Sequence, residues 1–228
     1  MFKKIIIGLS FVNVIAAFLF TFFYLPDTVP THFNADFIAD DYGSKWVLFA
    51  ITSIPALLSV IFIIYRFLTR NNEKIRKNVK YEDIIIPSII LMMICLMDII
   101  LIAVAVYTLT GFITPKETMG AIFSNSSIIC VSTFLIIIGN LMGKLKRNSL
   151  LGVRTKWTLA NDTVWLKTQR FSGYALVAVG IFSIICSVIS MFIESTVLGI
   201  FGFIILIVIA SVIMCVYSYV TYKKLNIK

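Results

Sequence analysis

The 228-residue chain is 60% hydrophobic, has a mean hydropathy of +1.00 and carries a formal net charge of +9. A soluble core of this size does not need so much apolar surface, and the apolar residues fall in runs of about 20, the length of a membrane-spanning helix. These features exclude an ordinary soluble protein. We explain the positive charge by basic residues gathered at one membrane face, and we predict no direct binding to nucleic acid.

Six apolar runs are long enough to cross a bilayer. The first, 5–24, is too long for the hydrophobic region of a signal peptide, so we expect it to be retained. Helices are expected because, in a single lipid-exposed segment, only they satisfy every backbone polar group. The further spans are predicted at about 46–65, with a kink at Pro55, and at about 84–109, 121–141, 174–193 and 197–219.

The charged residues sort between two sets of connecting segments. Eighteen of the 20 lysine and arginine residues lie at the termini or in the loops after the second and fourth spans, and six of the 11 acids lie in the opposite loops. Basic residues concentrate on the cytoplasmic side of membrane proteins. We therefore predict an all-α integral membrane protein with six transmembrane helices and with both termini in the cytoplasm.

The longest polar interruption, 139–173, carries seven basic residues, one acid and two of the three tryptophans. Each base at the centre of a spanning helix costs about 2.5 to 3.5 kcal/mol, so this stretch is expected at a membrane face, with its tryptophans near the interface. Thr158 or Asn161 could cap a short helix from about Asp162 to Phe171. A basic loop with an aromatic anchor would explain the charge, but the density of Gly, Asn, Thr and Trp indicates a built structure.

The second polar loop, 25–45, holds four acids and the only histidine, His32. A lone histidine in a loop is most often a hydrogen-bonding residue. With Asp36 and Asp40 at spacings of four it would suit a metal only if the segment were helical, and Pro30 makes that geometry doubtful. We predict no metal site and no cofactor, and we expect the acidic loop to attract a cationic peptide.

Asp98 is the only acid inside a predicted span. An ionisable group at that depth is a functional candidate. One interpretation is a hydrogen-bonded carboxyl facing Asn125 or Ser127 on a neighbouring helix. The other is a path with Asn125 and Asn140 in a small proton- or ion-coupled transporter. The sequence has no Ser-His-Asp set, phosphate loop or zinc motif, so we predict that the protein is not an enzyme.

The two polar segments resemble a known pair of domains. Residues 139–173 resemble the signature of the SdpI family of bacterial membrane immunity proteins. The matching segments are, in order, GN, MGK, GVRTKWTL, ND, VW and KTQRFSG. Gln169 stands where this family usually has a histidine, and Phe37 stands where a glycine is usual. The loop 25–45 resembles the small domain that often precedes the signature. The matching residues are Leu25, Pro26, Asp27, Pro30, His32, Phe33, Asn34, Asp40, Gly43, Ser44 and Lys45.

The resemblance implies a multi-pass protein of the bacterial plasma membrane that protects the cell from a secreted, membrane-active peptide toxin. In the founding member it also implies capture of a transcriptional repressor at the membrane. We predict a two-helix unit, 1–83, with an extracellular loop 25–45, and a four-helix SdpI-like domain, 84–228, with a cytoplasmic stretch 142–173. The expected partners are membrane lipids, the peptide toxin and a cytoplasmic repressor, and the oligomeric state is left open.

The candidate residues form three groups. Toxin or ligand binding in the outer loop is expected of His32, Phe33, Asn34, Asp40 and Lys45. Partner-binding or structural roles on the cytoplasmic side are expected of Asn140, Asn148, Gly152, Arg154, Thr155, Trp157, Thr158, Trp165, Lys167 and Arg170. The intramembrane polar candidates are Asp98 and Asn125.

Overall fold

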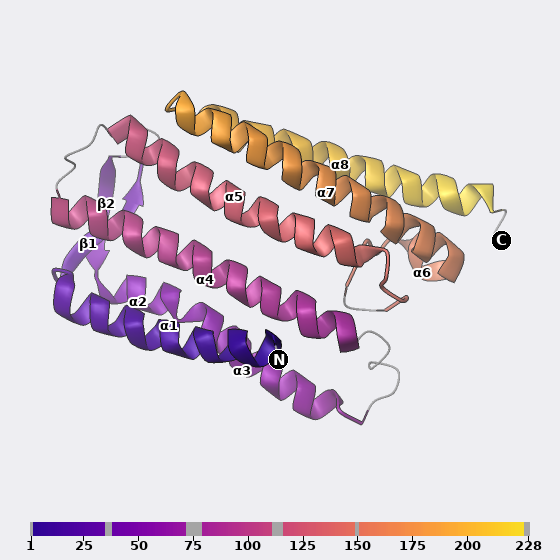
Figure 1. Cartoon of the computed structure of the whole chain (residues 1–228), viewed down its shortest axis with the longest axis horizontal. Helices are drawn as coiled ribbons and strands as arrows, with labels where there is room; N and C mark the ends of the chain where they lie inside the picture. The colour runs from indigo at the N-terminus through magenta and orange to yellow at the C-terminus, as the bar shows by residue number, and fades with distance from the viewer. Residues whose placement is uncertain (1, 35–37, 72–78, 111–115, 149–150, 226–228) are drawn as a thin grey trace.

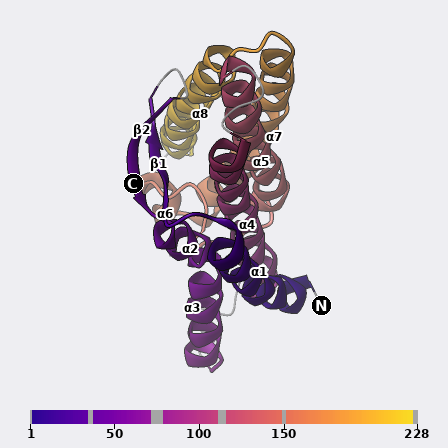
Figure 2. The same cartoon turned by 90° about the vertical axis from the view of Figure 1, so that its left-hand side faces the viewer.

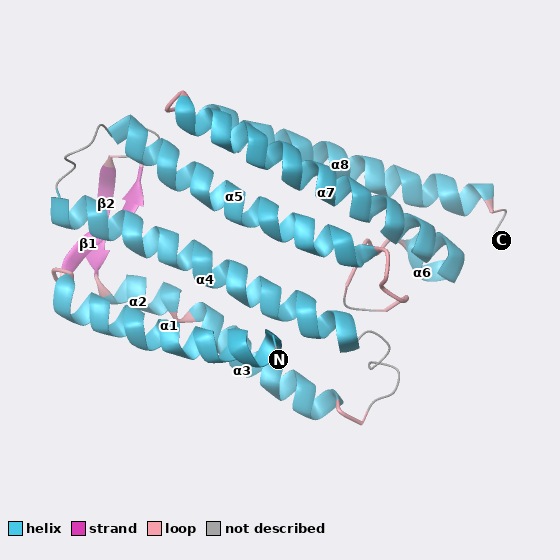
Figure 3. Cartoon of the chain, viewed as in Figure 1, coloured by secondary structure: helices cyan, strands magenta, loops and turns pink. Residues whose placement is uncertain are grey.

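The computed structural model describes residues 2–34, 38–71, 79–110, 116–148 and 151–225. The elements in chain order are α1 (Phe2–Tyr24), β1 (Thr28–Phe33), β2 (Ala39–Ser44), α2 (Trp46–Thr52), α3 (Ile54–Thr69), α4 (Val79–Thr110), α5 (Lys116–Met142), α6 (Lys156–Ala160), α7 (Asp162–Phe192) and α8 (Val197–Lys224). The long helices run side by side along one axis (Figure 1). Nearly all of the described chain is helix (Figure 3).

Six helical segments in the described chain are long and apolar enough to cross a membrane. They are α1, the α2–α3 pair, α4, α5, α7 and α8, which confirms the six predicted spans. The fifth span differs in one respect. The predicted short helix and the span that follows it form one continuous helix, α7, because the Asn161 side chain caps its first turn and no residue interrupts it afterwards.

The second span is divided in two at Ser53. The hydroxyl of Ser53 donates to the Phe49 carbonyl at 2.7 Å, and Pro55 stands in the first turn of α3. Proline has no N–H for a helical hydrogen bond, but in a first turn that donor is not needed. A new helix can therefore start at this point, and the interruption expected at Pro55 is confirmed.

The all-α fold class is confirmed for the spanning part, but the segment 25–45, which was expected to be a plain loop, contains an antiparallel β-hairpin. Thr28 pairs with Ser44 and Phe33 with Ala39, with an irregular register between them. The hairpin is anchored by Val29, which is fully buried in a cluster with residues of α1, α2 and α4. Figure 2 looks onto this end of the bundle, which we call the hairpin end.

At the other ends of the helices lie the beginning of α1, the end of α8, α6 and the beginning of α7 (Figure 1). We call this the basic end. The helices are held together largely by small residues. A Cβ on Gly139 of α5 would come within 2.7 Å of the Gly173 carbonyl of α7, and one on Gly180 within 2.7 Å of the Ser132 carbonyl. Small residues let membrane helices approach backbone to backbone, so α5 and α7 form a tight pair.

Candidate functional site

The signature stretch, residues 139–173, folds around a tryptophan. Trp165, on the first turn of α7, is fully buried, and its indole N–H donates to the Leu145 carbonyl at 2.7 Å. This bond joins the chain leaving α5 to the start of α7. Trp165 is therefore buried in the protein and does not present its ring to lipid, because its N–H finds a partner inside the protein and the ring fills the interior.

One turn further along α7, Gln169 holds the loop. Its amide oxygen accepts from the Val153 N–H at 3.0 Å, and its amide nitrogen donates to the Val153 carbonyl at 2.9 Å. Gly152 has a φ of +110°, and a Cβ there would lie 2.8 Å from the Gln169 Oε1. Glycine is thus required both by the backbone conformation and by the close approach of the amide. Sequence analysis placed Gln169 as a departure from the family but did not predict this bonding role.

The short helix α6 begins with a capping box formed by two threonines. The Thr155 hydroxyl accepts from the Thr158 N–H, and the Thr158 hydroxyl accepts from the Thr155 N–H at 2.9 Å. Such reciprocal bonds satisfy N–H groups that a helix start leaves open. The Thr155 hydroxyl also lies 3.1 Å from the Ser218 hydroxyl, and Trp157 packs against Tyr219 at 5.0 Å between ring centroids. These contacts dock α6 onto α8.

Side chains that bond to backbone complete the loop. Asn148 accepts from the Leu151 N–H at 2.7 Å and donates to the Lys146 carbonyl at 2.8 Å. Arg147 donates to the Leu159 carbonyl at 2.8 Å and pairs with the Asp162 carboxylate at 2.9 Å. These bonds shape the loop from within, so the signature stretch is a hydrogen-bonded scaffold as the residue composition indicated.

Four other cations of the signature stretch lie outside this scaffold. Arg154, Lys156, Lys167 and Arg170 are all exposed. The ammonium of Lys156 lies 5.4 Å from the Trp157 ring centroid. The structure therefore separates the predicted signature residues into a buried or hydrogen-bonded set that shapes the loop and an exposed basic set that a partner or a lipid surface can reach.

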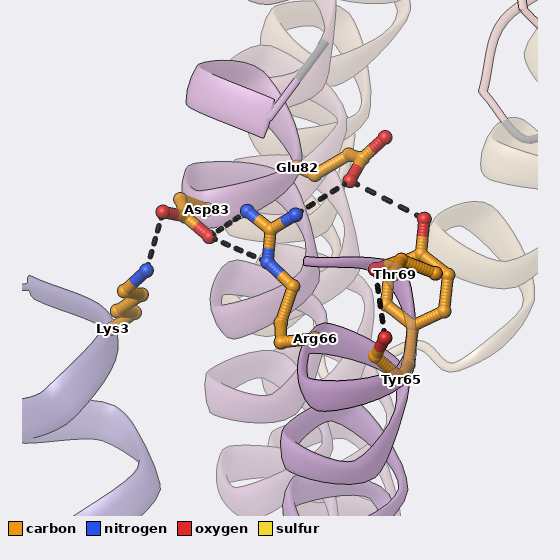
Figure 4. A network of polar contacts seen from close by, with 6 residues as sticks. All are labelled: Lys3, Tyr65, Arg66, Thr69, Glu82 and Asp83. Carbon is orange, nitrogen blue, oxygen red and sulfur yellow. Dashed lines mark hydrogen bonds and ion pairs between the residues drawn. The ribbon is translucent and has the colours of Figure 1, made fainter. Parts of the chain in front are cut away.

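A second charged cluster at the basic end joins three helices (Figure 4). Arg66 of α3 pairs with Glu82 at 3.1 Å and with Asp83, both on α4, and Lys3 of α1 pairs with Asp83. The Tyr65 hydroxyl faces Glu82 at 3.4 Å. Sequence analysis missed this cluster. The sequence feature that could have revealed the cluster is the adjacent acid pair Glu82–Asp83. It follows the basic loop after the second span, on the membrane face where acids are scarce.

At the hairpin end, His32 and Asp40 face one another across the two strands. The His32 Nδ1 lies 2.6 Å from the Asp40 carboxylate, and both side chains are exposed. The backbone here is extended, so the helical arrangement that a metal set with Asp36 would have required does not form. Asp36 and Phe37 lie outside the described residues.

The base of the hairpin is fixed to the bundle. Lys45 pairs with Asp27 at 3.2 Å, and the Phe33 ring packs edge-on against Tyr107 of α4 at 5.1 Å between centroids. A hydrogen bond between the Tyr42 and Tyr107 hydroxyls stabilises the protonated phenol of Tyr42 and raises its pKa above its ordinary value. The hairpin thus presents exposed polar side chains on a base that is packed against α1, α2 and α4.

The two intramembrane candidates lie in different surroundings. Both carboxylate oxygens of Asp98 accept from the Asn13 amide of α1, at 2.9 and 3.0 Å. Asn125 is fully buried and donates to the Ser195 carbonyl at 3.1 Å beside Gly199 of α8. Asp98 is hydrogen-bonded across to a neighbouring helix, as one interpretation expected, but its partner is Asn13 and not Asn125 or Ser127. Asn13 was overlooked, although it is the one amide in the first apolar run.

The fold and these sites define a multi-pass α-helical membrane protein with an ordered hairpin at one end and a basic scaffold at the other. Residues 144–217 match the family model of the SdpI/YfhL protein family, and residues 8–64 match that of a domain of unknown function, DUF1648. The chain is similar to the Immunity protein SdpI of Bacillus subtilis (strain 168), at 29% identity over 222 residues. That similarity covers 97% of this chain and 95% of the relative. No solved structure matches the chain.

The chain is thus similar to the SdpI/YfhL protein family in its residues 144–217 and to the DUF1648 domain in its residues 8–64. The six apolar helices and the similarity to SdpI make it a multi-pass protein of the bacterial plasma membrane. The side of the membrane on which the termini lie remains a prediction, as do the boundaries of the two units, 1–83 and 84–228.

Proposed function

We propose that this protein is an immunity protein that protects a bacterial cell from a secreted, membrane-active peptide toxin. The observation that carries the proposal is the similarity to the Immunity protein SdpI, because it extends over nearly the whole of both chains. A match confined to one helix could reflect apolar composition alone. This one includes both the hairpin and the signature stretch, and protection needs no catalytic step.

The hairpin end is the surface we assign to the toxin. Asp27, Asp40 and Asp41 are exposed there, whereas the ammonium of Lys45 is turned inward to pair with Asp27. Tyr42 is 54% exposed and offers apolar contact beside these carboxylates. An acidic surface with aromatic side chains complements a cationic amphipathic peptide. His32, Phe33 and Asn34 frame this surface rather than forming a pocket of their own.

The test is a survival assay. The protein is expressed in a toxin-sensitive bacterium, and the cells are exposed to cell-free supernatant of the bacterium that carries this gene. We expect higher survival than with empty vector, and loss of that advantage for Asp40→Lys/Asp41→Lys inserted at the same level. Equal killing of cells with and without correctly inserted protein would contradict the proposal.

The basic end is the surface we assign to a cytoplasmic repressor. Arg154 and Lys156 are exposed on a scaffold that α8 and α7 hold in place. The positive charges that would bind an acidic partner are therefore preorganised. A fluorescent regulator should leave the membrane when Arg154→Glu/Lys156→Glu is introduced, and remain with the control pair Lys223→Glu/Lys224→Glu. Unchanged capture by the first pair would count against this role.

Transport through Asp98 is the second candidate, and it has weaker support. Asp98 is hydrogen-bonded to α1, Asn125 to the turn before α8, and Asn140 to the Ile136 carbonyl of its own helix. These bonds do not link the three residues to one another. Proteoliposomes containing a pH-sensitive dye separate the two functions. Transport predicts that Asp98→Asn abolishes proton flux, and immunity predicts that it leaves protection intact.

A further inference from the structure

A cleft of about 370 Å³ lies between α5 and α7 at the basic end. It is distinct from the α6–α8 contact described above. Its lining residues are Gly139, Asn140, Gly143, Lys144, Arg170, Gly173, Tyr174 and Val177. The cleft therefore combines two cations, an amide and a phenol with three glycines, at the level where two membrane-spanning helices reach the interface.

The glycines explain why main chain, and not side chains, forms the floor of the cleft. The α5 and α7 backbones touch at Gly139 and Gly173, where a Cβ on Gly173 would come within 2.6 Å of the Gly139 carbonyl. A Cβ on Gly143 would meet the Cγ of Arg170 at 3.1 Å. The stem of Arg170 thus lies against a bare stretch of backbone. The floor of the cleft is main chain, and its functional groups come from the two sides.

The side chains are graded in polarity along the helices. Lys144 and Arg170 stand at the outer edge. Tyr174 lies four residues nearer the membrane centre than Arg170 on α7, and residues four apart on a helix share a face. Asn140 lies on α5, four residues before Lys144, which follows the end of that helix. Val177 follows Tyr174 in the next turn. The cleft thus runs from charged groups through hydrogen-bonding groups to apolar surface. A phospholipid has the same order, from its phosphate through its glycerol esters to its acyl chains.

The two cations are available for a ligand. Lys144 and Arg170 are exposed, and within the part of the chain that the structure describes neither forms an ion pair with an acid. Tyr174 is 77% exposed and has an amphipathic ring suited to the interface. Basic pockets between membrane-spanning helices bind anionic headgroups. This gives the cleft one occupant that fits both its charge and its depth.

We propose that this cleft binds the headgroup of an anionic phospholipid. Lys144 and Arg170 contact the phosphate, Arg170 through its planar fork of N–H donors. Tyr174 and Asn140 lie beside the ester region, and one acyl chain follows Val177. The bound lipid fills the cleft above this main-chain floor and so braces the end of α5 against α7. The proposal does not depend on the immunity function.

The experiment is native mass spectrometry of the full chain in detergent, with dioleoyl phosphatidylglycerol or dioleoyl phosphatidylcholine as the added lipid. At about 1 kcal/mol for each base near the surface, two bases predict a preference for phosphatidylglycerol of roughly thirtyfold. We expect Lys144→Gln/Arg170→Gln to remove it. Lys223→Gln/Lys224→Gln loses the same charge at the same end, away from the cleft, and should keep the preference. Lys144→Arg/Arg170→Lys should also keep it.

Each other result overturns the proposal. Equal loss with both glutamine pairs would mean that charge attracts lipid without a site. Retention by Lys144→Gln/Arg170→Gln, with helix content and monodispersity unchanged, would place the preference elsewhere. Displacement of phosphatidylglycerol by 10 mM inorganic phosphate, about the concentration at which a millimolar anion site fills, would make the site one for free phosphate. No preference in the wild-type chain would exclude the lipid directly.

Discussion

The hairpin end and the basic end of the bundle use their polar residues in opposite ways. On the hairpin, His32 and Asp40 bond to each other across two strands and remain exposed. At the basic end, Trp165 and Gln169 are fully buried and bond to main chain. A recognisable sequence signature can therefore mark a folding scaffold, while the surface available to partners lies in the less distinctive cations beside it.

The largest loss in the free energy of unfolding is expected at the charged cluster of the basic end. Arg66→Met removes the cation between Glu82 and Asp83 and leaves two partly or fully buried carboxylates without it. Breaking a buried pair by removing one partner costs about 3 to 5 kcal/mol. The free energy of unfolding, measured by titrating dodecyl sulfate into mixed micelles, should fall by that amount. Arg70→Met, at an exposed position against Phe67, should cost under about 1 kcal/mol. Equal losses would contradict the burial argument.

The next largest loss of stability is expected at Gln169, whose side-chain amide bonds to the Val153 backbone. Gln169→Ala removes the partner of the Val153 N–H and one of the two donors to the Val153 carbonyl, which keeps the Thr158 hydroxyl, and an unsatisfied buried group costs about 1 to 3 kcal/mol. We expect a loss of about 2 to 4 kcal/mol in the same unfolding titration, against under about 0.5 kcal/mol for the exposed Lys167→Ala. Gln169→His, the residue usual in the family, should lose less than alanine because a neutral imidazole keeps one donor and one acceptor. A histidine variant as unstable as the alanine variant would contradict this.

A smaller effect is expected at the start of α6. Thr155→Ala removes the hydroxyl that caps the helix and contacts Ser218. Loss of such a cap costs about 1 kcal/mol. Thr155→Ser keeps the hydroxyl and should retain most of the stability. Hydrogen exchange of the α6 amides provides the measurement. Exchange that is unchanged in the alanine variant would show that α6 is held without its cap.

The smallest effect on stability is expected at the hairpin. Asp40→Asn weakens an exposed pair with His32, and exposed pairs contribute about 0 to 1 kcal/mol. Unfolding should therefore hardly change, whereas protection in the survival assay should decrease because a carboxylate of the proposed toxin surface is lost. A stability loss as large as that of Gln169→Ala would mean that the two ends do not differ in the way described.

Much of the fold could be predicted because bilayer thickness and charge asymmetry act on long runs of residues. The apolar run that begins near residue 5 and the one that ends near residue 219 both became spanning helices. The hairpin could not be predicted from its residues in the same way. Its strands are short, its acidic β2 lacks regular alternation, and much of its stability comes from Val29 packing against distant helices.

The candidate sites were predicted less completely, and for a physical reason. Residue type indicated that Thr158 and Asn161 could act near a helix start, and Asn161 does cap α7. Pairings across the bundle depend on helix rotation, which the sequence leaves open. Asp98 therefore faces Asn13 rather than Asn125, and Gln169 turned out to be the residue that shapes the Gly152 turn.

The orientation of the two ends is the central claim, because both proposed surfaces depend on it. The direct measurement uses an impermeant maleimide on intact cells, with single cysteines at Asp41→Cys and Lys156→Cys in a background whose four native cysteines are replaced. Both positions are exposed on the protein. The account predicts labelling at 41 in intact cells and at 156 only after the membrane is permeabilised. Labelling at 156 but not at 41 in intact cells would contradict it.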